Sequence, residues 1–123
     1  MEMQEVAFAS IEPFVGAAVK DGVSMGNPAT ARWFAVMDAG EVVAFSSILP
    51  ISIGFRIRSS YVKPSHRGRG LYHLMMEHCL TICEQACASV EVLVDDLEPY
   101  WLKRGFKVVS RSKSGIARMV KLY

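Results

Sequence analysis

The chain has 123 residues, of which 51% are hydrophobic and 21% are charged. This length and composition fit one globular domain with a single core, residues 1–123, and exclude a disordered or low-complexity chain. The net charge of +2 is too small to indicate a polyanionic partner by itself.

The first half of the chain predicts a helix followed by strands. A short strand is expected over 5–9, and Ser10 is placed to cap a helix over 11–20. Strands are then expected over 32–37, 41–49 and 51–62, with a tight turn at 38–40 and a break at Pro50. Ser59 and Ser60 interrupt the alternation of the third strand, which indicates a β-bulge there.

The second half alternates helices and strands. Its expected elements are a helix over 71–88, a strand over 90–94, a helix over 98–103 and two closing strands over 106–110 and 116–122. A run of strands followed by helix, strand, helix and two strands predicts an α/β fold with a sheet of mixed direction.

Location and metal content are expected from the N-terminus and the cysteines. Glu2 and Glu5 precede no apolar run, so we expect no signal peptide, and no apolar stretch is long enough to span a bilayer. Cys79, Cys83 and Cys87 are odd in number, which favours reduced thiols in the cytoplasm. Nothing nearby completes a zinc site, and we expect buried thiols and no metal.

A basic, glycine-rich loop lies between a strand and a helix at Arg67-Gly68-Arg69-Gly70. The first amides of a helix have no intrahelical acceptor, and the helix dipole adds positive charge there, so an anion binds well. Glycines at 68 and 70 let the backbone approach the anion closely. The loop is not a Walker motif, because no Gly-Lys-Ser/Thr ends it. It is not the dinucleotide fingerprint G-x-G-x-x-G, because position 73 is His.

This loop resembles the acyl-CoA loop of the GNAT family of N-acetyltransferases, Arg/Gln-x-x-Gly-x-Gly/Ala. Arg67 and Gly70 match, whereas Tyr72 stands where Gly or Ala is usual. A second motif in 97–106 resembles the short helix of the family that ends in Tyr-x-Lys-x-Gly-Phe, with Lys103, Gly105 and Phe106 matching. The resemblance implies a single-domain GNAT-like acyl-CoA N-acyltransferase fold with a splayed, coenzyme A (CoA)-binding cleft.

The resemblance also implies where acyl-CoA would bind. The pantetheine arm would lie between the strands 55–62 and 90–94 and pair with main chain of Ser60, Tyr61 and Val62. The pyrophosphate would lie on the loop residues, which are Arg67, Gly68, Arg69, Gly70, Leu71 and Tyr72.

The catalytic acid and base are less directly marked. The tyrosine of the family that protonates the leaving thiolate aligns with Trp101, and indole cannot give up a proton to sulfur. Tyr100 is adjacent and is the candidate acid, although one residue rotates a helix by about 100°; protonation by water is the alternative. Asp95 and Asp96 are the candidate bases, with capping of the following helix as their structural alternative.

The expected activity is therefore acyl-CoA-dependent N-acyl transfer, with acetyl from acetyl-CoA passing to an amine by direct attack. One alternative is a CoA-binding or interaction module that has lost catalysis, because Trp101 replaces the usual acid. Another is a phage-type acyltransferase-like enzyme that modifies DNA bases, which the basic cluster over 103–121 permits without requiring. The expected partners are acyl-CoA and an amine acceptor, without a membrane.

Overall fold

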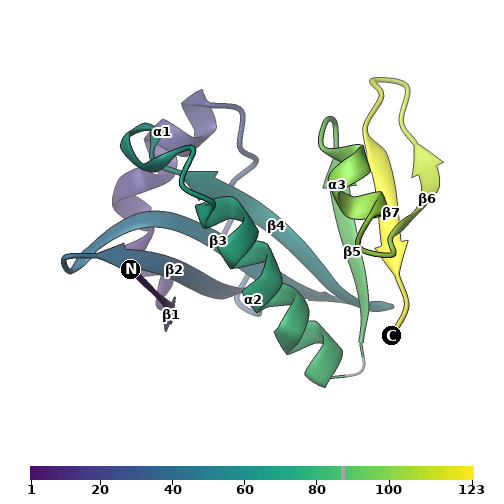
Figure 1. Ribbon diagram of the computed structural model, residues 1–123, viewed down its shortest axis with the longest axis horizontal. Coiled ribbons are helices and arrows are strands. Elements are labelled where there is room, and N and C mark those ends of the chain that lie inside the picture. The colour runs from purple at the N-terminus through teal and green to yellow at the C-terminus, as the bar shows by residue number, and fades with distance from the viewer. Residues whose placement is uncertain (87) are drawn as a thin grey trace.

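The computed structural model describes residues 1–86 and 88–123, and Cys87 lies outside the described residues. Seven strands form one sheet in the order β1-β2-β3-β4-β5-β7-β6 (Figure 1). The strands are β1 (Glu2–Val6), β2 (Arg32–Asp38), β3 (Glu41–Ile51), β4 (Gly54–Val62), β5 (Ser89–Val94), β6 (Lys107–Arg111) and β7 (Ala117–Lys121). The α-helices are α1 (Val15–Lys20), α2 (Leu71–Gln85) and α3 (Glu98–Leu102). Short 3₁₀ turns are η1 (Phe8–Ser10), η2 (Glu12–Phe14) and η3 (Pro64–His66).

The two faces of the sheet carry separate hydrophobic cores. On one face α2 buries Met75, Met76 and Cys79 against β2, β3, β4 and β5. On the other face Ile11 and the helix α1 cover a cluster of strand residues that are Trp33, Ala35, Val42, Phe45 and Tyr61. Period-two alternation along the strands produces both cores, because successive side chains point to opposite faces.

The N-terminal segment differs from the sequence-based expectation. The first strand lies at Glu2–Val6, and the helix expected over 11–20 is divided into η2 and α1. Ser10 ends η1 and is not the N-cap of either. Pro13 lies in the first turn of η2. Proline has no N–H to donate to a carbonyl four residues earlier, so a continuous α-helix can begin only at or after it.

The break expected at Pro50 is also wrong, because β3 continues to Ile51 and Pro50 pairs with Phe55 of β4. The partnership of β3 with β2 ends at Ile48. Beyond that residue one edge of β3 is unpaired, and a proline is tolerated where its missing N–H is not needed. The tight turn after β2 is as predicted, with Ala39 and Gly40 at φ of 50° and 82°.

Two of the three cysteines, Cys79 and Cys83, are buried free thiols, as the sequence predicts. Cys79 and Cys83 are free and fully buried in the core beneath α2. Burial raises the pKa of Cys79 to about 12 and that of Cys83 to about 11, so both are protonated near neutral pH. The third predicted thiol, Cys87, is outside the described residues.

In the part of the chain that the structure describes, no three His, Cys, Asp or Glu side chains gather as a metal site. Across the same residues, no helix combines the length and the apolar character needed to cross a membrane.

Candidate active site

The two central strands β4 and β5 meet at one end and part at the other. They pair in parallel only from Gly54↔Ser89 to Arg56↔Glu91. Beyond these pairs β4 stays on β3 and β5 stays on β7, so the two strands diverge (Figure 1). From Ile57 onward, the edge of β4 that faces β5 has no strand partner among the described residues, so an extended ligand can pair with main chain there.

A cleft of about 400 Å³ lies between the two strands where they diverge. Its walls come from β4, the segment after β5, the first turns of α2, and α3, and its lining includes Ile57, Arg58, Ser59, Ser60, Tyr72, Met76, Val92, Asp95, Asp96 and Trp101. We call this space the central cleft. Its volume lies within the range of small-molecule and cofactor sites.

The predicted bulge in β4 is present beside the central cleft. The register with β3 shifts between Phe45 and Ser47, and Ser59 has a φ of 57°. Ser59 Oγ donates to the Ser24 carbonyl at 2.7 Å, and Ser60 Oγ lies 2.7 Å from Ser46 Oγ. The bulge directs Ser60 into the wall of the central cleft, and the contact with Ser46 fixes the Ser60 hydroxyl.

The other two predicted pantetheine residues have their side chains elsewhere. Tyr61 is 5% exposed and packs against Phe45 in the core covered by α1. The carbonyl of Val62 accepts a hydrogen bond of 2.9 Å from Arg67 Nε. Any role of Tyr61 in binding therefore falls to its main chain.

The glycine loop adopts the conformation that close approach of an anion requires. Gly68 and Gly70 both have a φ of 76°, in the left-handed region that side chains disfavour. Gly70 is the N-cap of α2, and no side chain caps the helix. The amides of Leu71, Tyr72 and His73 thus have no acceptor within the helix.

The two arginines of the loop differ in their surroundings. Arg67 donates from Nη2 to Asp21 at 2.8 Å as well as to Val62, so its guanidinium holds the loop against the end of α1. Arg69 is exposed and lines a shallow hollow beside Gly70 and Leu71, on the outer side of α2. Arg67 therefore shapes the loop, while Arg69 supplies a cation at its surface.

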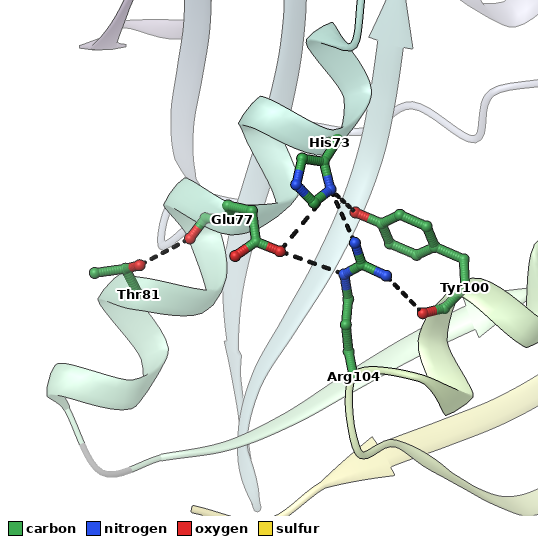
Figure 2. Close-up of polar contacts among 5 residues, drawn as sticks. All are labelled: His73, Glu77, Thr81, Tyr100 and Arg104. Carbon is green, nitrogen blue, oxygen red and sulfur yellow. Dashed lines mark hydrogen bonds and ion pairs between the residues drawn. The ribbon is translucent and has the colours of Figure 1, made fainter.

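Tyr100 lies on the seam between α2 and α3 and is absent from the lining of the central cleft. Its hydroxyl is 3.1 Å from Nδ1 of His73, and the Arg104 guanidinium stacks 3.4 Å from its ring (Figure 2). Arg104 Nη2 is 2.9 Å from the same Nδ1. Arginine can only donate, so where Nδ1 accepts from Arg104 the Tyr100 hydroxyl shares the same acceptor. Burial also raises the pKa of Tyr100.

Tyr72 is the tyrosine that does line the central cleft. Its side chain is half-buried and its ring centroid is 5.8 Å from that of Tyr100. Burial chiefly raises the pKa of Tyr72, and nearby Tyr100 and Asp96 act in the same direction, so its hydroxyl keeps its proton. In the sequence, Tyr72 is notable only because it replaces the Gly or Ala that is usual at this position of the acyl-CoA loop.

Trp101 lines the same cleft and is 1% exposed. Its indole Nε1 is buried without a hydrogen-bond partner in the described structure. Buried tryptophan N–H groups usually have a partner, so an orphan donor beside a cleft indicates a site for a ligand acceptor. No sequence signal reveals an unsatisfied donor, because it depends on the packing of the whole core.

Asp95 and Asp96 both line the central cleft, directly after β5. Neither caps the following helix, because the N-cap of α3 is Leu97 and no side chain caps it. The capping alternative is therefore wrong, and both carboxylates stand at the wall of the cleft.

Comparison with known proteins identifies this arrangement. A family model described as the acetyltransferase (GNAT) family matches residues 7–106. This chain belongs to the acetyltransferase (GNAT) family. The predicted family and fold are thus confirmed.

Individual relatives agree with this family. The chain is 29% identical over 97 residues to the peptidyl-lysine N-acetyltransferase YjaB of Salmonella typhimurium, covering 79% of this chain. It spans 64% of the length of that curated relative. The crystal structure of Escherichia coli ElaA matches with a TM-score of 0.78 at 16% identity, covering 98% of this chain and 99% of that one.

A further GNAT-like structure contains a ligand. The PaiA N-acetyltransferase from Thermoplasma acidophilum, solved in complex with coenzyme A, matches with a TM-score of 0.74 at 12% identity. The match covers 99% of this chain and 98% of that one. At such identities the two matched structures establish the fold alone.

Proposed function

We propose that this GNAT protein is an acyl-CoA-dependent N-acetyltransferase that transfers acetyl from acetyl-CoA to an amine. The observation that carries the proposal is the central cleft, which opens where β4 and β5 part and is bordered by the first turn of α2. An unpaired strand edge and an uncapped helix N-terminus suit the two chemically different parts of acyl-CoA, an amide-containing arm and a pyrophosphate. The coenzyme A complex of the PaiA enzyme supports the same ligand.

Binding is assigned to main chain more than to side chains. The pyrophosphate lies against the amides of residues 68–72, where Gly68 and Gly70 leave room. Arg69 adds charge from the surface of the loop. The pantetheine arm runs along the unpaired edge of β4 next to Ser60 and the main chain of Tyr61, while the Val62 carbonyl stays bound to Arg67.

In the reaction the amine nitrogen attacks the thioester carbonyl carbon, a C–N bond forms, and the C–S bond breaks with its electron pair on sulfur. The attacking ammonium must first lose a proton, and we assign that proton to Asp95 or Asp96. The thiolate gains a proton from the Tyr72 hydroxyl or from water, and the second proton that nitrogen loses on forming the amide restores that donor. The orphan N–H of Trp101 donates a hydrogen bond to the bound thioester and stabilises the charge that develops there.

This assignment moves the acid away from Tyr100, the residue that the sequence favours. Tyr100 donates its hydroxyl to His73 outside the cleft, and would have to break that bond to reach sulfur. Tyr100 remains a candidate only through such a movement.

Release of free CoA thiol from acetyl-CoA, measured across a panel of primary amines, tests the proposal. We expect amine-dependent release and an N-acetylated product by mass spectrometry. The name of the YjaB relative makes a lysine-containing peptide one member of that panel. Coenzyme A binding without thiol release for any amine would instead support a module without catalysis.

A further inference from the structure

A second cavity lies on the face of the sheet away from α2. Along β5, Val90 and Val92 pack into the core beneath α2, so Glu91 and Leu93 point to the opposite face. There a groove of about 430 Å³ is lined by Ser24, Arg56, Arg58, Leu93, Asp95 and Ile116, among others. We call it the far-face groove.

The far-face groove opens into the central cleft, because Arg58, Ser59 and Asp95 line both cavities. A molecule that enters through the groove therefore meets the place where the thioester would lie. Its roof is the segment after α1, which is held by the hydrogen bond from Ser59 Oγ to the Ser24 carbonyl. The groove therefore leads to the central cleft from the face of the sheet away from α2.

The two arginines of the groove have different partners. Arg56 donates to Glu91, a 2% exposed carboxylate that also accepts from Arg118, so Arg56 has an anionic partner that it shares with Arg118. Arg58 forms no ion pair with any residue of the described ranges. Its one hydrogen bond runs to the Gly26 carbonyl at 3.4 Å, a long contact for a half-buried guanidinium.

Burying a cation without an anion is unfavourable, and here burial and the nearby charge of Arg56 both lower the pKa of Arg58. Most of the five N–H donors of a guanidinium are left over at Arg58. A carboxylate or phosphate in the groove would accept from them and offset the unbalanced charge. Asp95, in the same two cavities, suits an ammonium group.

From these observations we propose that the acceptor is an amine that also carries an anionic group, which binds Arg58 while its ammonium faces Asp95. This inference rests on the proposed acetyltransferase function. The anion is either the carboxylate of a small amino acid or a glutamate or aspartate beside a lysine in a peptide, since both present the same groups.

The test measures thiol release from acetyl-CoA with matched acceptors. One arm compares ω-amino acids of increasing length with their carboxamides, and the other compares lysine peptides whose neighbouring residue is Glu or Gln. We expect the anionic member of the favoured arm to have a KM lower by roughly tenfold or more, as for a charge-assisted hydrogen bond. The arm that shows the difference identifies the source of the anion.

Variants of Arg58 make the assignment specific. Arg58→Gln should raise the KM for the anionic acceptor by roughly tenfold and leave the uncharged acceptor within about twofold. Arg58→Lys should keep part of the preference, and Arg58→Glu should favour acceptors with a second cationic group. Arg32→Gln, on β2 where Arg32 pairs with Glu5, is the matched control and should keep the wild-type preference.

Equal KM values for charged and uncharged acceptors would overturn the inference and leave the acetyltransferase proposal intact. Loss of coenzyme A affinity in Arg58→Gln by calorimetry would also overturn it, because Arg58 would then bind acyl-CoA. Failure of every amine to support thiol release would instead refute the proposed function itself.

Discussion

Gly54 and Ser89 form the first of the residue pairs that join β4 to β5, at the closed end of this contact, and no side chain fits there. A Cβ on Gly54 would lie 2.2 Å from the Ser89 carbonyl oxygen and 2.8 Å from its nitrogen. The φ of Gly54 is 147°, which side chains also disfavour. This close approach of two backbones joins β4 and β5 at the end of their contact away from the central cleft.

Replacing this glycine should therefore lower the stability of the protein. Gly54→Ala should lower the free energy of unfolding by about 2 kcal/mol or more, through steric overlap and backbone strain. Urea denaturation measures the loss. Gly16→Ala in α1 is the matched control, since a Cβ there meets nothing within 4 Å, and it should raise stability by roughly 0.5–1 kcal/mol. Equal effects of the two substitutions would contradict this description of the contact between Gly54 and Ser89.

The buried carboxylate of Glu91 should make the free energy of unfolding depend on pH in the acidic range. Burial alone would raise its pKa, but hydrogen bonds from Arg118 and Arg56 outweigh burial and lower it. The folded-state pKa is then below the unfolded value of about 4.3. Glu91 contributes stability above about pH 4.3, and that contribution disappears as the pH falls through the folded-state pKa. Glu91→Gln should be less stable at pH 7 and lose less on acidification, as denaturation at several pH values would show. A wild-type acid dependence in this variant would refute the assignment.

The two described thiols should be unreactive and dispensable for binding. In a Cys87→Ser background, a thiol reagent should label Cys79 and Cys83 only after denaturation, because both are buried and protonated. Cys79→Ala with Cys83→Ala should cost about 1–2 kcal/mol through lost packing and keep the affinity for coenzyme A. Stoichiometric bound zinc, or rapid labelling of the folded protein, would show a different role for these cysteines.

The position of the two tyrosines predicts opposite kinetics. Tyr72→Phe should lower kcat by roughly tenfold or more if its hydroxyl protonates the thiolate, since general acids contribute about 10²–10⁴-fold and water replaces them in part. Tyr100→Phe should change kcat by less than about threefold, because its hydroxyl is bound to His73 outside the cleft. A tenfold loss in Tyr100→Phe with full activity in Tyr72→Phe would reverse the assignment and restore the acid expected from sequence.

Much of the fold follows from local sequence signals. The turn at Ala39 and Gly40 and the bulge at Ser59 are set by residues within a few positions, and both lie where predicted. Pro50 shows the limit of such reasoning. Whether a proline ends a strand depends on whether the edge that lacks its N–H has a neighbouring strand. At Pro50 this depends on where the pairing of β3 with β2 ends, which is Ile48.

The site divides in the same way. The loop over 67–72 is recognisable because its glycines and arginines are contiguous, and they have the backbone conformation that the motif indicates. Sequence alone cannot decide whether Tyr100 or Trp101 faces the cleft, because one residue rotates a helix by about 100°. Core packing decides it: Trp101 packs against Phe106 with ring centroids 5.0 Å apart, which leaves Tyr100 to His73 and Arg104. The lack of an anionic partner at Arg58 likewise depends on the fold, because Glu91 pairs with Arg56 and Arg118 instead.

The most direct test of the account measures coenzyme A binding by calorimetry in two glycine variants. Gly70 and Gly40 have φ of 76° and 82°, and a Cβ at either meets nothing within 4 Å, so valine strains both backbones alike. Only Gly70 lies at the proposed pyrophosphate site. The account predicts that Gly70→Val weakens coenzyme A binding by roughly tenfold or more while Gly40→Val binds like the wild type. Wild-type affinity in a folded Gly70→Val variant would contradict the placement of acyl-CoA at the N-terminus of α2.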